Sequence, residues 1–261
     1  MRALKTAALG MTAQQMNVDI IANNLANVNT TGFKKSTIEF QDLLYETMQT
    51  GNRDGEKGRE NPNQLQVGLG NRAIATNRSF SEGTVAETGN PLDIAINGKG
   101  FFQVEMPDGT YAYTRDGSLN VNSEGKIVTN SGLPIVPDIN IPENSQSLSI
   151  SQNGVISVML NGEVEAQELG QIELVSFMNP AGLEALGGNL FIQTEASGDP
   201  VYGNPAEEGM GSLMQGYLEK SNVDVAEEMI NLIVAQRAYE MNSKAVRTAD
   251  ELMSLANGLK R

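Results

Sequence analysis

Residues 3–28 read ALKTAALGMTAQQMNVDIIANNLANV. Side chains recur there at alternating steps of three and four residues, all apolar except one glutamine: Leu4, Ala7, Met11, Gln14, Val18, Ile21, Leu25 and Val28. A period of 3.5 residues is typical of helices that wrap around one another. The stretch therefore predicts a terminal helix of roughly 40 Å, at 1.5 Å per residue. It should pack against another helix and end in the turn residues at 29–32.

A second long helix is predicted at the opposite end of the chain, over residues 224–257. Asp224 and Glu227 have the spacing of a capping box, and Gly258 follows as a stop signal. Two stripes run along this helix. The first contains Val225, Met229, Leu232, Gln236, Tyr239, Ser243, Val246 and Met253, and the second contains Ile230, Val234, Met241, Ala245, Leu252, Leu255 and Leu259. One partner helix covers only one such stripe. The helix is therefore either buried in an ordinary globular core or in contact with both the first helix and neighbouring copies.

The chain between these helices has the signals of β structure from about residue 73 to 211. Short Val, Ile, Leu and Tyr runs alternate with turn pairs that predict successive hairpins: Asp108-Gly109, Asp116-Gly117, Glu124-Gly125, Asn153-Gly154 and Asn161-Gly162. Gly98-Lys99-Gly100 is interpreted as another hairpin turn, and residues 171–177 and 189–194 as further strands. The fold class predicted is α+β, in which terminal α-helices form a coiled-coil-like domain and an antiparallel β-rich domain is inserted between them.

Four segments follow from this pattern. Residues 1–30 form the N-terminal helix, 31–72 a connector, 73–223 a β-rich outer domain and 224–261 the C-terminal helix. Within the connector, residues 51–63 contain no apolar side chain and cannot form a core. This stretch is either a disordered linker or an inter-subunit arm that becomes ordered against a neighbour. Six arm residues are predicted to take part: Gly51, Arg53, Asp54, Gly55, Lys57 and Arg59.

Composition excludes several classes of function. The 261 residues include no Cys and no His, so the usual zinc, copper and iron sites and the Ser-His-Asp and Cys-His nucleophile pairs cannot form. A net charge of −14 argues against binding to nucleic acid or to an anionic membrane surface. No enzyme activity, cofactor or metal is therefore expected.

The N-terminus lacks the features of a cleaved secretory leader. Gln14, Gln15, Asn17 and Asp19 interrupt the apolar run that such a leader needs. No stretch approaches the ~20 apolar residues of a membrane span. If the protein is exported, we expect a route without a cleaved signal peptide, and no direct membrane insertion.

Three carboxylates could be imagined as a paired-carboxylate or calcium site: Asp108, Asp116 and Glu124. Each precedes a glycine in a predicted tight turn, where Asp is favoured for backbone reasons, and no spacing matches an EF-hand loop. The turn interpretation is therefore preferred. Gly98-Lys99-Gly100 likewise lacks the length and the Lys-Ser/Thr ending of a phosphate loop.

An asparagine-rich stretch lies near the end of the first helix, where Asn23, Asn24 and Asn27 fall within five residues. Asparagine weakens a helix. Asn23 and Asn27 could fray the helix end as turn residues, or could make inter-helix hydrogen bonds that fix the register, as buried polar groups do in coiled coils.

Three motifs in the chain resemble those of flagellar axial proteins, the family of rod, hook and hook-associated subunits. The first is Ala22-Asn23-Asn24-Leu25-Ala26-Asn27 with Thr30-Thr31-Gly32-Phe33-Lys34. The second is Leu92-Asp93-Ile94-Ala95-Ile96-Asn97-Gly98-Lys99-Gly100-Phe101-Phe102 with Tyr113-Thr114-Arg115-Asp116-Gly117. The third is Ser221-Asn222-Val223-Asp224 with Ala235-Gln236-Arg237-Ala238-Tyr239-Glu240. They occur in the family's order and span essentially the whole chain, and the family resemblance favours the register-fixing interpretation of the asparagines.

The resemblance implies a structural subunit that polymerises into a helical tube and transmits motor torque through the periplasm. The chain has no room for the outer domains of a hook protein, and its polar arm with Leu65-Gln66-Val67-Gly68-Leu69-Gly70 resembles the distal rod subunit. A proximal rod or hook-type subunit is the alternative within the family. Expected partners are copies of the chain, proximal rod subunits, hook protein and surrounding ring proteins. The expected location is the flagellar basal body, reached by type III export.

The residues predicted to form the self-assembly interface come from both terminal helices. They are Leu4, Met11, Val18, Ile21, Asn23, Asn24, Leu25, Asn27, Val28, Val225, Met229, Leu232, Gln236, Tyr239, Val246 and Met253. Two alternatives outside the family are a secreted β-rich binding module and a carboxylate-dependent hydrolase. Neither explains heptad patterns at both ends of the chain.

Overall fold

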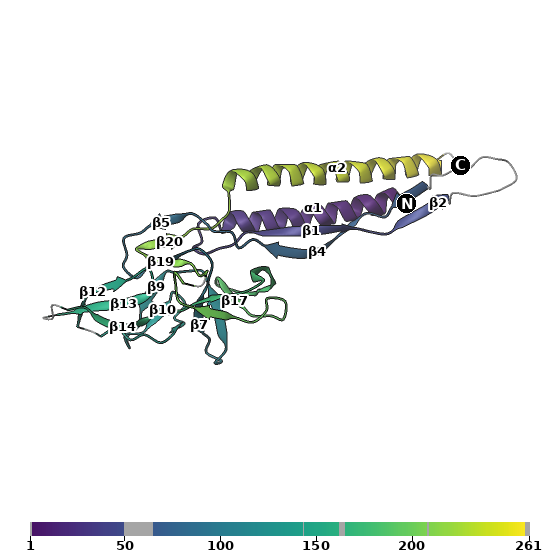
Figure 1. The fold of residues 1–261 in the computed structure, drawn as a ribbon. Coiled ribbons are helices and arrows are strands. Elements are labelled where there is room, and N and C mark those ends of the chain that lie inside the picture. The colour runs from purple at the N-terminus through teal and green to yellow at the C-terminus, as the bar shows by residue number, and fades with distance from the viewer. Residues whose placement is uncertain (1, 50–64, 143, 162–164, 208, 259–261) are drawn as a thin grey trace. The chain divides into compact units, whose positions relative to one another are not determined.

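The computed structural model describes residues 2–49, 65–142, 144–161, 165–207 and 209–258 (Figure 1). It contains two long helices, α1 (Arg2–Ala26) and α2 (Val225–Gly258), separated in the sequence by a large antiparallel β-rich region. The predicted α+β class is confirmed. Neither helix combines the length and hydrophobicity that crossing a membrane requires, within the part of the chain described.

The chain divides into two compact units. The first contains Met1–Leu25, Ser36–Asn77 and Val225–Arg261, and the second contains Ala26–Lys35 and Arg78–Asp224. Both units are therefore discontinuous in sequence. The first holds the helices and the strands nearest to α1, and the second holds the rest of the β structure.

The first unit includes two strand pairs where the sequence predicted only a connector. β1 (Ser36–Asp42) pairs with β4 (Asn71–Arg78), and β2 (Tyr45–Gln49) pairs with β3 (Leu65–Gly68). Ile38 and Phe40 alternate with polar neighbours in β1, which is the period of a strand. The connector prediction missed this alternation because it rested on the polar stretch that follows. All six residues of the predicted arm fall within 50–64, outside the described residues.

The helix bounds differ slightly from those predicted. α1 ends at Ala26, two residues before the predicted end at Val28, and α2 begins directly after Asp224. Glu227 and Glu228 lie in the first turn of α2, where acidic side chains interact favourably with the positive end of the helix dipole.

The second unit is built from small antiparallel sheets. The largest has the order β11 (Ile135–Val136), β7 (Phe102–Glu105), β8 (Tyr111–Thr114), β17 (Leu190–Ile192), β16 (Glu184–Gly187). A three-stranded sheet contains β12 (Ser145–Ile150), β13 (Val155–Leu160) and β14 (Gln167–Gln171). Four further pairs join β5 (Val85–Glu87) to β20 (Tyr217–Glu219), β6 (Ile94–Asn97) to β19 (Ser212–Gln215), β9 (Leu119–Val121) to β10 (Ile127–Thr129), and β15 (Leu174–Ser176) to β18 (Val201–Gly203). A short 3-10 turn, η1, spans Pro180–Gly182.

Three of the predicted hairpins are confirmed. Asp108-Gly109 joins β7 to β8, Glu124-Gly125 joins β9 to β10, and Asn153-Gly154 joins β12 to β13. Asp108 also accepts hydrogen bonds from the backbone amide and the hydroxyl of Thr110, which supports its interpretation as a turn residue. The turn at Asn161-Gly162 runs into residues outside the described ranges.

Two other hairpin predictions are wrong. The strand before Gly98-Lys99-Gly100, β6, pairs with the distant β19, whereas β7 pairs with β8 and β11. Asp116-Gly117 likewise connects strands of different sheets. Both glycines are needed for close backbone approach, since a Cβ at Gly98 would lie 2.7 Å from the Gly211 Cα, and one at Gly117 would overlap the Ile94 carbonyl oxygen.

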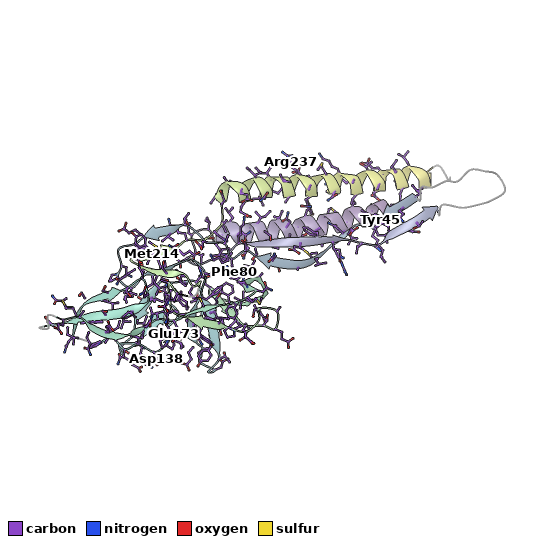
Figure 2. The ribbon with its side chains drawn as sticks, viewed as in Figure 1. Tyr45, Phe80, Asp138, Glu173, Met214 and Arg237 are labelled. Carbon is purple, nitrogen blue, oxygen red and sulfur yellow. The ribbon has the colours of Figure 1, made fainter. Side chains whose placement is uncertain are left out.

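The core of the second unit has an aliphatic and an aromatic part. The aliphatic part is made mainly of buried Ile, Val and Leu side chains, drawn from β6, β7, β13, β19 and several other segments. The aromatic part gathers Phe101, Phe177 and Phe191, and the half-buried Phe80, labelled in Figure 2, packs edge to face on Phe101 and Phe191 with centroids 5.5 and 5.3 Å apart. The predicted strands at 171–177 and 189–194 carry part of it.

Candidate functional site

The two terminal helices pack side by side and antiparallel within the first unit (Figure 1). Their contact is fixed at two levels. Near one end, the Asn24 Nδ2 lies 3.4 Å from a carboxylate oxygen of Glu228. Two heptads further along, Gly10 faces Asn242 so closely that a Cβ would lie 2.8 Å from the Asn242 Nδ2. Residue numbers that rise along α1 therefore fall along α2.

The side of α2 that faces α1 is made of small and polar residues together with a few apolar ones. The seam has the 3.5-residue period of a coiled coil and contains Glu228, Leu232, Ala235, Asn242, Val246, Ala249 and Met253, all buried or half-buried. Ala235 is 1% exposed. The first predicted stripe is therefore not a single seam: Leu232, Val246 and Met253 belong to the α1 contact, whereas Val225, Met229, Gln236 and Tyr239 are exposed.

Large apolar side chains of α2 remain in solvent. Nine of them are between 41% and 65% exposed: Val225, Met229, Ile230, Ile233, Val234, Tyr239, Met241, Leu252 and Leu255. Eight of them come from the two predicted stripes, and the ninth, Ile233, belongs to neither stripe. Large apolar side chains left exposed in such number on one helix indicate a site of association.

The apolar seam of α1 is mostly covered within the subunit. Ile21 is buried, and Leu4, Met11, Val18 and Leu25 are half-buried. Val28 lies beyond the helix end and is also half-buried. Val18 and Gln15 line an open hollow of about 420 Å³ with Gln236, Tyr239 and Glu240 of α2. The predicted apolar interface residues of α1 are thus largely covered within the subunit itself.

Asn24 links α1 by hydrogen bonds to β1 and α2. It is 1% exposed, its Oδ1 accepts the Ser36 backbone N–H at 3.0 Å, and its Nδ2 donates to the Ser36 carbonyl at 2.8 Å and to Glu228. This one side chain connects α1, β1 and α2, as a register-fixing polar group does. Asn23 is exposed, while Asn27 lies just past the helix and accepts a hydrogen bond from the Thr30 hydroxyl. A hydrogen bond between the helices, as considered for Asn23 and Asn27, is thus made by their neighbour Asn24.

The close approach at Gly10 leads to a first prediction. Gly10→Leu should destabilise the helix pair by about 1–3 kcal/mol, because the larger side chain overlaps Asn242. Adding Asn242→Ala makes room and should restore more than half of the loss in helical thermal unfolding, followed by circular dichroism. An equal loss in both backgrounds would show that Gly10 does not act through Asn242.

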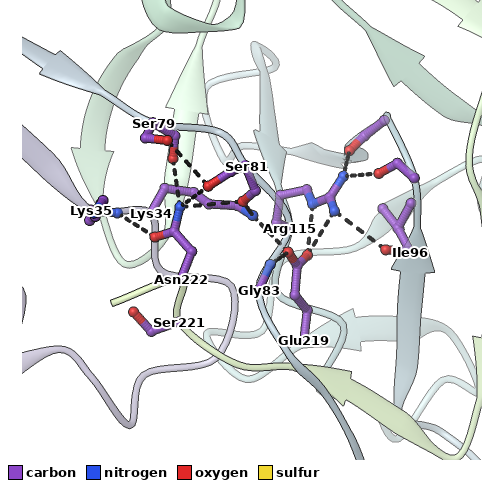
Figure 3. Close-up of polar contacts among 12 residues, drawn as sticks. Lys34, Lys35, Ser79, Ser81, Gly83, Ile96, Arg115, Glu219, Ser221 and Asn222 are labelled. Carbon is purple, nitrogen blue, oxygen red and sulfur yellow. Dashed lines mark hydrogen bonds and ion pairs between the residues drawn. The ribbon is translucent and has the colours of Figure 1, made fainter. Parts of the chain in front are cut away.

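A buried charge cluster in the second unit was missed from the sequence (Figure 3). The Lys34 Nζ lies 2.6 Å from one carboxylate oxygen of Glu219, and the Arg115 Nη2 lies 2.8 Å from the other. The amide of Gly83 donates to the same carboxylate at 2.8 Å. All three charged side chains are at most 5% exposed, so the carboxylate is both desolvated and fully hydrogen-bonded.

The same cluster ties together segments far apart in the sequence. Arg115 also donates to the carbonyls of Ile96, Gly98 and Gly100, while Lys34 donates to the Ser81 carbonyl. Lys34 and Arg115 belong to the motifs quoted for the family resemblance, but their pairing depends on tertiary contact. No periodicity in the sequence marks Glu219 as its centre.

A second set of bonds lies beside the charge cluster. The Lys35 amide donates to Asn222 at 2.7 Å, and Asn222 donates to the Ser79 carbonyl at 2.9 Å. The Gly32 amide donates to the Glu219 carbonyl at 2.9 Å. The segments 26–35 and 217–222 are thus fastened to each other and to the strands around residue 80.

Electrostatics favour the ionised carboxylate. Burial alone would raise the pKa of Glu219, but Arg115, Lys34 and the Gly83 amide together hold it below its ordinary value of 4.5. Burial lowers the pKa of Lys34, partly opposed by Glu219. Between its folded and unfolded pKa, Glu219 binds more protons in the unfolded chain, so its contribution to stability is present above about pH 4.5 and is lost as the pH falls through the folded pKa.

We therefore expect Glu219→Gln to alter the acid dependence of folding. The difference in unfolding free energy between the wild type and Glu219→Gln should be largest above pH 4.5 and shrink below it. Urea unfolding between pH 3 and 7 measures this difference. Asp138→Asn, which removes a half-exposed carboxylate paired with Lys126, is the matched control. A difference that stays constant with pH would contradict the assignment.

The fold and the motifs together are those of a flagellar axial protein, and three family models match the chain in the expected order. They are described as flagella basal body rod protein (residues 4–34), flagellar hook protein FlgE/F/G D1 domain (residues 95–158) and flagellar basal body rod FlgEFG protein C-terminal (residues 214–259). Curated relatives show which flagellar axial protein the chain is most similar in type to. The flagellar basal-body rod protein FlgG of Borreliella burgdorferi is 54% identical, covering 100% of this chain and 99% of the relative.

Two other FlgG proteins match over their full length. The one from Caulobacter vibrioides is 47% identical and the one from Bacillus subtilis 38% identical, each covering 100% of both chains. The chain belongs to the flagellar basal-body rod protein family and is of the FlgG type. The predicted role as a structural subunit of the distal rod is confirmed by this membership, and the alternatives, inside or outside the family, are not favoured.

Proposed function

We propose that this chain polymerises head to tail, through its terminal helices, into a helical tube that serves as the distal part of the flagellar drive shaft and transmits motor torque to the hook. The observation that carries the proposal is that nine large apolar side chains of α2 are exposed. A monomer leaves this surface in water, whereas a neighbouring copy would bury it, at about 25 cal/mol per Å² of apolar area.

Two different surfaces of one chain produce such a polymer. A contact between unlike faces repeats from copy to copy and gives an open helix when the rotation does not close. In the first unit, α1 and α2 each have a surface that could contact a neighbouring copy. A structural, non-catalytic role is part of the proposal, because the curated relatives are flagellar basal-body rod proteins.

The finer parts of the proposal rest on the family resemblance. The chain would contact copies of itself, proximal rod subunits, hook protein and surrounding ring proteins. It would lie in the basal body across the periplasm after export without a cleaved signal peptide. The polar arm, with Gly51, Arg53, Asp54, Gly55, Lys57 and Arg59, would lie between axially adjacent copies and limit bending.

Electron microscopy of the purified chain tests the proposal. The full chain should form straight tubes, and a variant lacking residues 2–26 should form none, because α2 then loses its partner helix. The second unit retains its own core, so near-ultraviolet circular dichroism of its aromatic cluster should be unchanged in the truncated chain. Tubes of normal form without α1 would contradict assembly through paired terminal helices.

A further inference from the structure

Each terminal helix has an exposed face opposite the contact with its partner. The α1 outer face consists of exposed residues that recur along one side of the helix: Lys5, Ala8, Thr12, Gln15, Met16, Asp19, Ala22 and Asn23. The α2 outer face consists of Ile230, Val234, Arg237, Met241, Lys244, Thr248, Glu251, Leu252 and Leu255, all exposed. Figure 2 shows Arg237 on the side of α2 that points away from α1.

The two outer faces differ in side-chain size. Apart from its two charged residues, the α1 outer face carries mainly Ala, Thr, Gln and Asn with a single large apolar side chain, Met16, whereas the α2 outer face carries Ile, Val, Met and Leu. Large side chains of one helix pack into the shallow surface left by small side chains of another. The faces are therefore complementary in shape but lie on opposite sides of the helix pair, so they can meet only between two copies of the chain.

Charge gives the register of this contact. On α1, Lys5 and Asp19 lie fourteen positions apart, and on α2, Arg237 and Glu251 also lie fourteen positions apart. Fourteen residues of helix span about 21 Å and two heptads, so the members of each pair lie on one face. In an antiparallel arrangement, Asp19 then meets Arg237 at the same time as Lys5 meets Glu251.

These charges are available in the single subunit. Within the described ranges, Lys5, Asp19 and Glu251 make no ion pair, and Arg237 pairs only with the exposed Glu240 at 2.9 Å, one helical turn away. An exposed pair of that kind contributes little to stability, so Arg237 can exchange Glu240 for a new partner.

We propose that the α1 outer face of one copy docks antiparallel on the α2 outer face of the next, with Asp19 opposite Arg237 and Lys5 opposite Glu251. In that register Ala22 faces Val234 and Ala8 faces Thr248, so a small α1 residue meets a larger α2 residue at both levels. This inference rests on the proposed function and names the surface through which neighbouring copies meet.

The register also implies a stagger between copies. Inside one subunit, Gly10 lies level with Asn242 and Asn24 with Glu228. Between copies, each α1 residue lies opposite an α2 residue four positions further along α2 than the one at its level inside a subunit. This is a shift of about 6 Å along the helix. A constant axial step of this kind prevents a flat ring from closing and produces a helical array.

Charge exchange tests the register. Asp19→Arg alone and Arg237→Asp alone should each raise the critical concentration for polymer formation roughly fivefold to tenfold, because each places like charges opposite one another. The double variant should return to within about twofold of wild type. Asp250→Arg, which makes the same charge change on α2 away from its outer face, is the matched control. Sedimentation at low and high salt gives the measurement.

The outcomes separate this inference from the proposed function. A double variant no better than either single variant, or single variants without effect, would overturn the register while wild-type polymer still forms. Failure of the wild-type chain to polymerise would instead contradict the proposed function.

Cysteine cross-linking provides an independent readout, because the chain has no native Cys. Under mild oxidation, polymer of the Ala8→Cys/Thr248→Cys chain should give a ladder of covalent dimers, trimers and larger species. Ala8→Cys/Ser243→Cys, whose second position lies on another side of α2, should give none. Equal ladders, or no ladder from either, would contradict the docking of these faces.

Discussion

The Ile230→Asp/Val234→Asp chain should remain monomeric at concentrations where the wild type is fully polymerised. Both side chains are more than 60% exposed, so their replacement costs the folded monomer little. In the polymer the two carboxylates would be buried in an apolar contact, at a cost of at least roughly 2 kcal/mol each. That loss corresponds to about a thousandfold weaker association.

A matched apolar variant isolates this effect. Ile230→Leu/Val234→Leu keeps the hydrophobic surface and should polymerise within about tenfold of wild type, since volume-conserving apolar exchanges are tolerated. Light scattering gives the association, and far-ultraviolet circular dichroism checks that α2 is retained. Normal polymer from the Asp variant would show that this part of α2 remains in solvent after assembly.

Glu219→Gln should destabilise the second unit by about 3–5 kcal/mol at neutral pH. The substitution leaves Lys34 and Arg115 charged and buried without a counter-ion, which is the most costly way to break a buried ion pair. Unfolding in urea, followed by tyrosine fluorescence, measures the loss. Asp138→Asn breaks an ion pair whose side chains are 37% and 50% exposed and should cost less than about 1 kcal/mol.

A second substitution shows whether the loss comes from unpaired charge. Lys34→Met in the Glu219→Gln background removes one of the two stranded cations and should recover part of the stability. Arg115 cannot be replaced as readily, because the carbonyls of Ile96, Gly98 and Gly100 would lose their donor. No recovery in the double variant would mean that Glu219 acts through its bond to the Gly83 amide instead.

Local patterns were sufficient to predict both helices and several turns of this fold, but not the strands β1, β2 and β3. The heptads of α1 and α2 depend on residues close in sequence, and both helices were predicted to within about two residues of their ends. Turns closed by neighbouring residues, such as Asp108-Gly109, were also predicted correctly. Gly98 and Gly117 have the same local signature, but they serve contacts with Gly211 and Ile94. Their role depends on pairing between distant strands, which a local pattern does not contain.

The assembly surface was predicted only in outline. Two apolar stripes on α2 indicated more than one partner, but hydrophobicity did not show which residues face α1. That contact includes the small or polar residues Ala235, Asn242 and Glu228, and at Gly10 the helices approach so closely that a Cβ would meet Asn242. Several of the largest apolar residues are thereby left on the outside. The charge cluster around Glu219 was missed because its members lie 81 and 104 positions apart along the chain, beyond any periodic signal.

Protection of the α2 outer face on assembly is the most direct test of the account. Met241→Cys introduces a single thiol at a position that is 65% exposed in the subunit. A maleimide reagent should label it rapidly in the monomer and at least about tenfold more slowly in the polymer, with labelling restored when the polymer is dissociated. Equal labelling rates in monomer and polymer would show that α2 does not carry the contact between subunits.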